Sequence, residues 1–427
     1  MSEKIYRDSV HNIIRLKTGD AAGKLLASLI DAAEFQRLRR VKQLGLALFA
    51  YQAAEHSRFT HSLGALHLAT RTLDKLKSKY EISPETQIAV RCAALLHDIG
   101  HGAFSHVIET ILGFQHEQFT IEAVLSDETE VGRILKTFSK DLPENVAAII
   151  RGDFRPMALA QLVSSQLDVD RMDYLLRDSL MTGAKYGVYD LEWIIKSLEI
   201  DEENDRLYVS GRGIYAVEDY LQARYYMFRQ VYFHRTLRSA EAVLKSLLRR
   251  ALEVFQTGKP IWFAVDTPFE KILKGEKLSL QQHLELDDAD VMFHIKQWQN
   301  SADEILSDLA KRFLNRRLFK VFDLDMPEAE RREFLNGARA LTEREGFDIN
   351  YYFIEDRAGD VPYYFYTKEQ TEKKNLIYVE EGFSRPQIKE ISEVSAAVRG
   401  LQKEYQIHRV CFPPEIKTEM ARLYHRK

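Results

Sequence analysis

The sequence has little of several features that define large classes of protein. It holds two cysteines, Cys92 and Cys411, among 427 residues, and two cysteines this far apart give neither a disulfide framework nor a zinc motif. The formal net charge is only −4, so there is no general case for a nucleic-acid or membrane partner. No apolar run is long enough to span a bilayer, and the first residues lack the apolar core of a signal peptide. We therefore expect a soluble, cytoplasmic protein.

The residues that are present favour a mostly α-helical chain with a large core. Hydrophobic residues make up 45% of the sequence. Between about residues 23 and 320 they recur at three- and four-residue spacing, which is typical of amphipathic helices. Residues 204–215 interrupt this pattern, and the apolar runs 207–209 and 214–215 flank a glycine-containing segment. This interruption predicts a small β-hairpin within the helical core.

The composition changes near residue 330, where aromatic and β-branched runs alternate with polar clusters. Such runs are typical of strands. We expect a helical core over residues 1–325, with its motifs in residues 50–180, and a smaller C-terminal α+β lobe over 326–427. The elements expected in this lobe are strands at 351–354, 363–366, 376–379 and 408–412 and a helix at 388–405.

The most informative stretch is residues 93–102, Ala-Ala-Leu-Leu-His-Asp-Ile-Gly-His-Gly. The apolar residues before it predict a buried helix over residues 85–97, and His97 and Asp98 stand side by side at its end. Adjacent side chains reach one metal ion only where the backbone bends, and we expect the two following glycines to allow this through left-handed conformations. Imidazoles and a carboxylate on a buried scaffold are costly unless a partner satisfies them, and a divalent metal does so directly.

A second group of polar residues lies upstream of this stretch. Arg58 and His61 are three residues apart, so one helical face or entry turn aims both at one pocket. A long helix is expected from about residue 61 to residue 80.

A third group lies downstream, in residues 167–178. Asp170, Tyr174 and Asp178 recur at every fourth position, which places two carboxylates and a phenol on one helical face. Asp173 and Arg177 are also four residues apart, and we interpret them as an ordinary ion pair along the helix.

Together, His61, His97, Asp98 and Asp170 resemble the H…HD…D signature of the HD-domain superfamily of metal-dependent phosphohydrolases. The resemblance implies that these four residues hold a divalent metal ion, without distinguishing Mg, Mn, Fe or Zn. A metal ion that is held by both imidazoles and carboxylates, with coordination positions left open for water, is also typical of a site that activates water. Longer strings resemble the deoxynucleoside triphosphate triphosphohydrolases, and these strings are residues 57–64, 97–106, 116–117 and 168–178.

The same resemblance implies roles around the metal. It makes His106 the acid that protonates the leaving 5′-oxygen, with Glu109 as its carboxylate partner and His101 beside them. Close packing on the sugar would exclude a 2′-hydroxyl, other side chains would hold the 3′-hydroxyl, and arginines and histidines would hold the triphosphate. The residues implied to bind substrate are Gln43, Leu44, Arg58, His116, Arg171, Tyr174, Asp178, Arg224 and Tyr232.

Members of this family are activated by nucleotides bound between subunits, so the resemblance implies a dNTP or GTP activator and a homo-oligomer, with a tetramer favoured. The residues that match the activator site are Lys4, Ile5, Asp31, Gln36, Arg39, Arg316 and Lys320. Asp31 and Arg39 are equally compatible with ordinary charges on a helix surface.

The resemblance implies hydrolysis of a dNTP to a deoxynucleoside and inorganic triphosphate. Two alternatives stay open. One is another HD-type phosphohydrolase, such as a nucleotide phosphatase or phosphodiesterase. The other is a regulator that senses nucleotides or binds single-stranded DNA, although the net acidity of the chain does not favour nucleic-acid binding.

Overall fold

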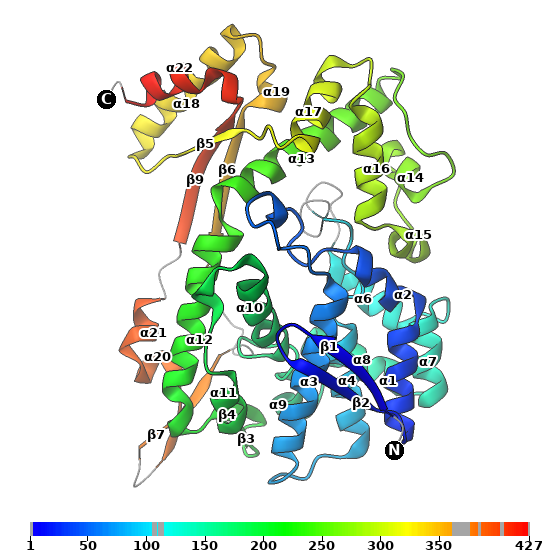
Figure 1. Cartoon of the computed structure of the whole chain (residues 1–427). Helices are drawn as coiled ribbons and strands as arrows, with labels where there is room; N and C mark the ends of the chain where they lie inside the picture. Colours follow the sequence, from blue (N-terminus) through cyan, green and yellow to red (C-terminus); the bar gives the residue numbers. More distant parts are fainter. Residues whose placement is uncertain are drawn as a thin grey trace.

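Two long helices form the axis of the molecule, α12 (Ile214–Met227) and α13 (Arg235–Gln256). The computed structural model describes residues 3–104, 109, 115–360, 376–382, 386–401 and 405–425. A helical body lies beside α12 and carries the N-terminus, and a small sheet with its own helices lies at the far end and carries the C-terminus (Figure 1). This architecture confirms the predicted mostly α fold with a smaller α+β lobe.

The helical body is built on α3 (Arg58–Leu76), which packs against both α4 (Pro84–Leu96) and α10 (Val169–Thr182). The apolar faces of these three helices are excluded from water and form the main core. The helices that surround them are α1 (Ala21–Asp31), α2 (Ala33–Arg37), α6 (His116–Leu125), α7 (Glu130–Phe138), α8 (Leu142–Arg151), α9 (Met157–Ala160) and α11 (Leu191–Ser197).

The helices that carry the motifs begin and end at capping residues. The Ser83 hydroxyl accepts a hydrogen bond from the Thr86 amide, with Pro84 in the first turn of α4. The Asp168 carboxylate caps α10, which ends at Gly183 with φ 74°. These local signals fix where each motif helix starts and which face it turns to the core.

A second core lies between α13 and four following helices and buries Trp298 and Phe313. It closes one side of the cavity described below. These helices are α14 (Pro268–Lys274), α15 (Leu280–Glu285), α16 (Asp288–Trp298) and α17 (Glu304–Leu314).

The described strands form three small sheets. An antiparallel hairpin of β1 (Glu3–Asp8) and β2 (Asn12–Lys17) packs on the body. The order β5-β9-β6 forms the far lobe, with β5 (Lys320–Asp323), β6 (Ile354–Asp360) and β9 (Tyr405–Phe412) all antiparallel. The helices α18 (Glu328–Arg344), α19 (Ile349–Tyr352) and α22 (Lys417–Tyr424) complete that lobe.

The third sheet joins distant parts of the chain in the order β3-β4-β7-β8. The β3–β4 hairpin belongs to the helical body, and β7 pairs with β4 in parallel through Val209 and Val379. Two strands and two short helices from beyond residue 326 therefore lie with the helical body. The strands of this sheet are β3 (Leu198–Asp201), β4 (Arg206–Val209), β7 (Tyr378–Glu381) and β8 (Gln387–Glu390), and the two short helices are α20 (Ile391–Val394) and α21 (Ala396–Gly400).

Some element predictions are wrong in detail. The hairpin exists, but its turn precedes Arg206, and Ile214 begins α12 because the glycine-containing segment forms a helical turn. Residues 351–352 end a short helix, and the predicted helix over 388–405 divides into β8, α20 and α21. The predicted strand at 363–366 lies outside the described residues, whereas the predicted strand at 408–412 is confirmed as part of β9.

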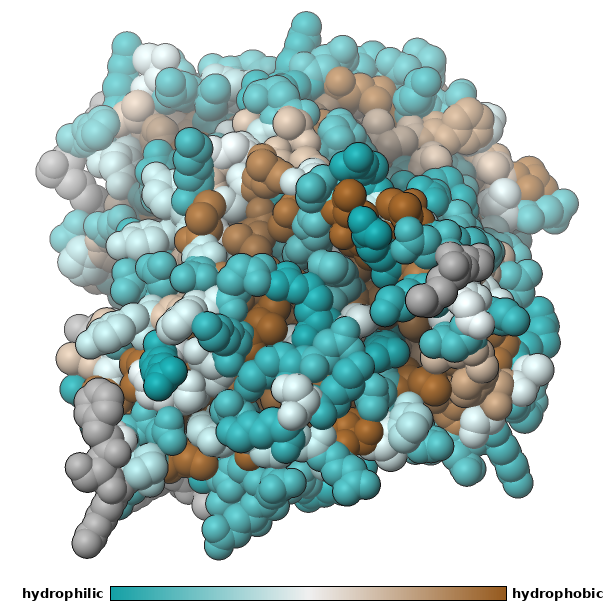
Figure 2. All heavy atoms as spheres, turned by 60° about the horizontal axis from the view of Figure 1, so that its bottom comes forward, coloured by the Kyte–Doolittle hydropathy of each residue, from teal (hydrophilic) through white to brown (hydrophobic). Residues whose placement is uncertain are grey.

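Hydrophilic side chains cover most of the face in Figure 2, and hydrophobic ones gather in a few patches between them. This mixture is ordinary for a protein face in contact with water. None of the helices in the described part of the chain combines the length and the apolar character that a membrane span needs.

Candidate active site

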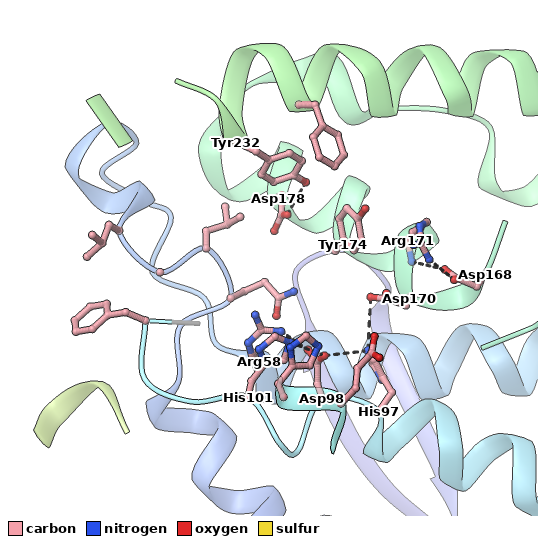
Figure 3. A pocket seen from close by; sticks show the side chains of 18 of the residues that line it. Arg58, His97, Asp98, His101, Asp168, Asp170, Arg171, Tyr174, Asp178 and Tyr232 are labelled. Atoms are coloured by element: carbon pink, nitrogen blue, oxygen red, sulfur yellow. Dashed lines mark hydrogen bonds and ion pairs between the residues drawn. The ribbon is translucent and has the colours of Figure 1, made fainter. Parts of the chain in front are cut away.

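A cavity of about 720 Å³ opens where α3, α4 and α10 meet the junction of α12 and α13. Charged and aromatic side chains from all these elements point into it (Figure 3). The cavity brings together most of the residues predicted from the sequence. Those that line it are Gln43, Leu44, Arg58, His97, Asp98, His101, His116, Asp170, Arg171, Tyr174, Asp178 and Tyr232.

Three predicted metal ligands converge at the inner end of this cavity. The Nε2 atoms of His61 and His97 are 3.3 Å apart. The Oδ1 atom of Asp170 lies 3.0 Å from the first and 3.6 Å from the second. Asp98 lies beside them, with Oδ1 3.5 Å from His97 Nε2 and Oδ2 3.9 Å from His61 Nε2. The four residues of the signature therefore form one cluster.

The hydrogen bonds behind this cluster fit a metal ion. His97 Nδ1 lies 3.0 Å from the carbonyl of Ala94, which can only accept, so this nitrogen carries the proton. His61 Nδ1 lies 2.8 Å from Oδ2 of the buried Asp173 carboxylate. Both imidazoles thus turn the lone pair of Nε2 toward the cluster, and a cation between them relieves the repulsion of the two lone pairs.

The electrostatics of the cluster lead to the same conclusion. Burial alone would lower the pKa of His61, but hydrogen bonds with Asp170 and Asp173 raise it to about 10. Burial likewise opposes ionisation of Asp98, yet Arg58 and the neighbouring histidines hold the pKa of Asp98 well below its usual range. Carboxylates that draw protons onto the two imidazoles in this way also attract a divalent metal, which would take the place of those protons at the Nε2 atoms.

The sharp turn after α4 depends on Gly100, for a reason other than the predicted one. Gly100 does not adopt a left-handed conformation. A Cβ at this position would lie 2.2 Å from the carbonyl oxygen of His116 and 2.3 Å from the amide nitrogen of Thr120. Glycine is needed here because α6 approaches the turn closely, and Thr120 then bonds both the Gly100 amide and the His97 carbonyl.

Histidines and a carboxylate form a second group on the α6 side of the cavity. The rings of His101 and His116 stack with centroids 3.5 Å apart. Glu109 binds both Nδ1 atoms, at 3.1 Å and 3.2 Å. Burial, and then the charge of Arg58, lower the pKa of His101 to about 4. This trio is a second group whose atoms lie close enough to hold a metal. His106 lies outside the described residues, so its pairing with Glu109 stays a prediction.

Arg58 joins the two groups, because its Nη1 donates to Oδ2 of Asp98 at 2.5 Å. Both side chains are buried. Arg58 is thus a fixed positive charge at the edge of the metal cluster. His101 Nε2 lies 3.4 Å from Oδ1 of the same Asp98, so the metal cluster and the stacked histidines adjoin, and a phosphate bound beside them would meet the Arg58 guanidinium.

Asp178 and two aromatic residues form the opposite end of the cavity. Asp178 accepts from His56 Nε2 on one oxygen and from the Tyr232 hydroxyl on the other, both at 2.8 Å. Tyr232 stands on a single π-helical turn, Phe228–Tyr232, between α12 and α13, and such turns are frequent at functional sites. Burial raises the pKa of Tyr174 to about 12, so its phenol stays neutral at pH 7.

The two predicted phosphate-binding arginines on α10 and α12 differ in their placement. Arg171 lines the cavity and is held by Asp168 and by the carbonyl of Ser165. Arg224 does not line the cavity. Its Nε and Nη1 are buried without a hydrogen-bond partner in the described structure, and its guanidinium faces the Phe228 ring at 5.6 Å.

The predicted activator residues fall into two separate groups. Lys4 and Asp31 form a 2.5 Å ion pair on the surface, with Ile5 exposed beside Lys4. Arg39 bonds Gln36 at 2.8 Å and stacks over the Phe59 ring.

The second activator group lies on a different segment of the surface. Arg316 bonds the carbonyl of Phe49 at 2.9 Å, and Lys320 is exposed at the start of β5. No described contact joins these two residues to the group around Lys4.

Three residues that support the cluster, and one that supports Asp178, were not predicted to be functional. The predicted ion pair of Asp173 and Arg177 is confirmed, but both side chains are 0% exposed and Asp173 also binds His61. His11 binds the other oxygen of Asp173, and His56 binds Asp178. Gly64 is the sequence feature that could have pointed to Asp173. A Cβ at this position would lie 1.8 Å from the Asp173 carboxylate, so only glycine fits there.

The comparisons agree with this geometry. The family model of the HD domain matches residues 58–178, and that of the HD-associated region matches residues 189–260. A solved phosphohydrolase from Bacteroides thetaiotaomicron superposes with a TM-score of 0.82, at 31% sequence identity over 96% of this chain and 100% of that one. Fold and site are thus those of an HD-type hydrolase.

The chain belongs to the HD-domain family. Over 97% of its length it is 37% identical to the uncharacterized protein YwfO of Bacillus subtilis, of which 93% is covered. It is also 30% identical over 266 residues to the Dictyostelium discoideum homologue of the deoxynucleoside triphosphate triphosphohydrolase SAMHD1. That match covers 58% of this chain and 50% of the relative.

Proposed function

We propose that the protein hydrolyses dNTPs to a deoxynucleoside and inorganic triphosphate. One observation carries the proposal: the metal cluster shares one cavity with Arg58 and a pair of stacked histidines and with the polar side chains of Asp178 and Tyr232. Arg58 bonds Asp98 of the cluster, His101 and His116 stack beside it, and Asp178 and Tyr232 bond each other in the same cavity. A triphosphate bound beside Arg58 and a deoxyribose bound beside Asp178 would place the α-phosphorus at the cluster.

The residues of the cavity have separate tasks in this reaction. When bound by His61, His97, Asp98 and Asp170, a divalent metal would supply Lewis-acid activation of water and of a phosphoryl oxygen. Arg58 and Arg171 hold the negative charge of the triphosphate, and the stacked histidines line the same part of the cavity. These fixed charges orient the α-phosphate before any bond changes.

The sugar side supports a choice of deoxyribose. The Asp178 carboxylate can accept the 3′-hydroxyl, and Tyr174 faces the same space. Gln43 and Leu44 close the cavity beside them, and close packing there would exclude a 2′-hydroxyl. Water adds to the α-phosphorus as the bond to the 5′-oxygen breaks, and that oxygen takes a proton, for which His106 is our candidate donor.

An HD-type phosphohydrolase that acts on other nucleotides or phosphate esters is the main alternative. Such an enzyme would use the same metal cluster but would not need side chains that bind a sugar. The Asp178 carboxylate in the cavity, which suits a sugar hydroxyl, therefore favours the dNTP reaction. A regulator that binds nucleotides or single-stranded DNA without catalysis would leave the complete set of metal ligands unexplained.

We further propose activation by a dNTP or GTP and assembly as a homotetramer. The surface group around Lys4 and Arg39 and the separate group around Arg316 suit an activator that touches two subunits. Sedimentation analysis with and without GTP or dGTP tests this, since the nucleotide should increase the fraction of tetramer. A mass that does not respond to nucleotide would contradict it.

The reaction is tested by incubating the protein with Mn²⁺ or Mg²⁺ and each dNTP alone, then all four dNTPs, then all four NTPs. We expect triphosphate from the dNTPs, at least from the mixture, and far less from the NTPs. Asp98→Ala is the control and should release none. Normal metal binding without triphosphate release would overturn the proposal and leave the alternative phosphohydrolase.

A further inference from the structure

The turn of the N-terminal hairpin reaches from the surface into the buried support of the metal cluster. It connects β1 to β2, and its His11 and Asp8 side chains are 3% and 4% exposed. His11 Nε2 lies 2.7 Å from Oδ1 of Asp173. These two residues are 162 positions apart in the sequence, so no local preference explains their contact.

Asp173 links this turn directly to a metal ligand. Its Oδ1 is bound by His11, and its Oδ2 lies 2.8 Å from Nδ1 of His61. The carboxylate thus stands between two imidazoles, one from the hairpin and one from the cluster. When a metal-ligating histidine donates its other ring N–H to a carboxylate, the carboxylate fixes the tautomer and the ring orientation of that histidine. The carboxylate also raises the basicity of the histidine.

Arg177 closes the network into a ring. Its Nε and Nη2 donate to the two oxygens of Asp173 at 2.8 Å and 2.9 Å, and its Nη1 donates to Oδ2 of Asp8 at 2.8 Å. Oδ1 of Asp8 in turn accepts from the amides of Val10 and His11 at 2.8 Å. The conformation of the hairpin turn and the position of Asp173 therefore depend on each other.

We propose that this hairpin turn is a positioning element of the metal centre, with His11 as its key residue. His11 donates from Nε2 to Asp173, and Asp173 then holds the His61 ring with Nε2 toward the cluster. His11 does not touch the metal or the substrate. The inference rests on the proposed function only in requiring a divalent metal at the four signature residues.

The test measures Mn²⁺ affinity by titration calorimetry in His11→Leu, His11→Gln and the unmodified protein. Loss of the donor in His11→Leu should weaken Mn²⁺ binding by up to about 10-fold, the lower end of the range for residues that bond a ligating histidine directly. The glutamine amide can take the place of Nε2, so His11→Gln should recover most of the affinity. At saturating Mn²⁺, His11→Leu should still lower kcat more than it raises KM.

A matched control comes from His67, whose ring contacts that of His11 with centroids 5.1 Å apart. His67 makes no hydrogen bond to Asp173 among the described residues, so His67→Leu should leave Mn²⁺ affinity near that of the unmodified protein. If His11→Leu does not fold, His11→Phe keeps a ring against His67 without the donor and should weaken Mn²⁺ binding in its place.

Two outcomes would overturn the inference: unchanged Mn²⁺ affinity in His11→Leu, or an equal loss in His67→Leu. Failure of the proposed function looks different. In that case the unmodified protein binds Mn²⁺, the His11 variants weaken binding as expected, and no dNTP is hydrolysed by any of them.

Discussion

His56 supports Asp178 as Asp173 supports His61. Its Nε2 donates to Asp178 across 2.8 Å, and both side chains are 2% exposed. The Tyr232 hydroxyl fixes the other oxygen of the same carboxylate. Asp178 therefore has one defined orientation at the sugar end of the cavity, although no short-range motif connects residues 56, 178 and 232.

Replacing His56 should affect substrate binding more than the chemical step. A buried hydrogen bond to a charged group contributes about 1.5–3 kcal/mol, so His56→Leu should raise the KM for dNTPs by about 10-fold or more. His56→Gln keeps an N–H donor and should restore part of the affinity. Steady-state kinetics with a single dNTP measure both, and an unchanged KM in His56→Leu would contradict this role for Asp178.

The surroundings of His283 predict how the stability of the protein depends on pH. Its ring stacks on Phe119 and its Nε2 lies 2.7 Å from the Gly100 carbonyl. Burial, and then the charge of Arg37, lower the pKa of His283 to about 4. Because the unfolded value is about 6.5, the unfolded chain binds this proton first, and the stability that His283 contributes is lost as pH falls from about 6.5 to about 4.

The glutamine variant isolates this effect. His283→Gln keeps a donor near Gly100 but cannot titrate, so its Tm should fall less steeply than that of the unmodified protein between pH 6.5 and pH 4.5. Thermal unfolding followed by circular dichroism at half-unit pH steps gives the two slopes. Parallel slopes would show that His283 is not held neutral in the folded state.

At the scale of elements, the motif helices were predictable because their signals are local. The four-residue spacing of Asp170, Tyr174 and Asp178 needs only the helical period, and the Ser83 and Pro84 start signal needs only a cap. The contacts that complete the site link distant elements. The hairpin turn at His11, the close approach of α6 to Gly100 and the pairing of β7 with β4 depend on tertiary packing, which single-sequence patterns do not contain.

Gly64 is where two elements meet too closely for a side chain. A Cβ on this residue of α3 would lie 1.8 Å from Oδ1 of Asp173 and 2.5 Å from Nη2 of Arg177 on α10. Gly64→Ala should therefore destabilise the protein by about 1–3 kcal/mol or more and should weaken Mn²⁺ binding as well.

The control for Gly64→Ala is a helical glycine with free space around it. Among the described residues, none has an atom within 4 Å of a Cβ added to Gly400 in α21, so Gly400→Ala should change the unfolding free energy by less than about 1 kcal/mol. Thermal unfolding of the three proteins measures the difference. Equal Tm values for Gly64→Ala and Gly400→Ala would mean that α3 and α10 are not packed as closely as described.

At the scale of the whole molecule, the C-terminal region is shared between the far lobe and the helical body. Val379, Ile391 and Val398 are 0% exposed and belong to the main core with the motif helices. The far lobe has its own core around Phe334, Val410 and Met420. The chain therefore passes from the body to the far lobe, returns to the body at β7, and enters the far lobe again at β9.

A chain that ends at residue 325 should not fold on its own. The truncation uncovers the edge of β4 and removes four buried residues from the main core, Ile377, Val379, Ile391 and Val398. We expect it to be insoluble or to unfold without a cooperative transition. A soluble fragment with the Tm of the full chain would instead make residues 1–325 an independent domain.

The central claim is that water attacks the α-phosphorus and releases triphosphate intact. Hydrolysis of a dNTP mixture with Mn²⁺ in ¹⁸O-labelled water, followed by mass spectrometry of the products, tests it most directly. The account predicts one ¹⁸O atom in the triphosphate and none in the deoxynucleoside. Release of a deoxynucleoside monophosphate with pyrophosphate, or ¹⁸O in the deoxynucleoside, would contradict it.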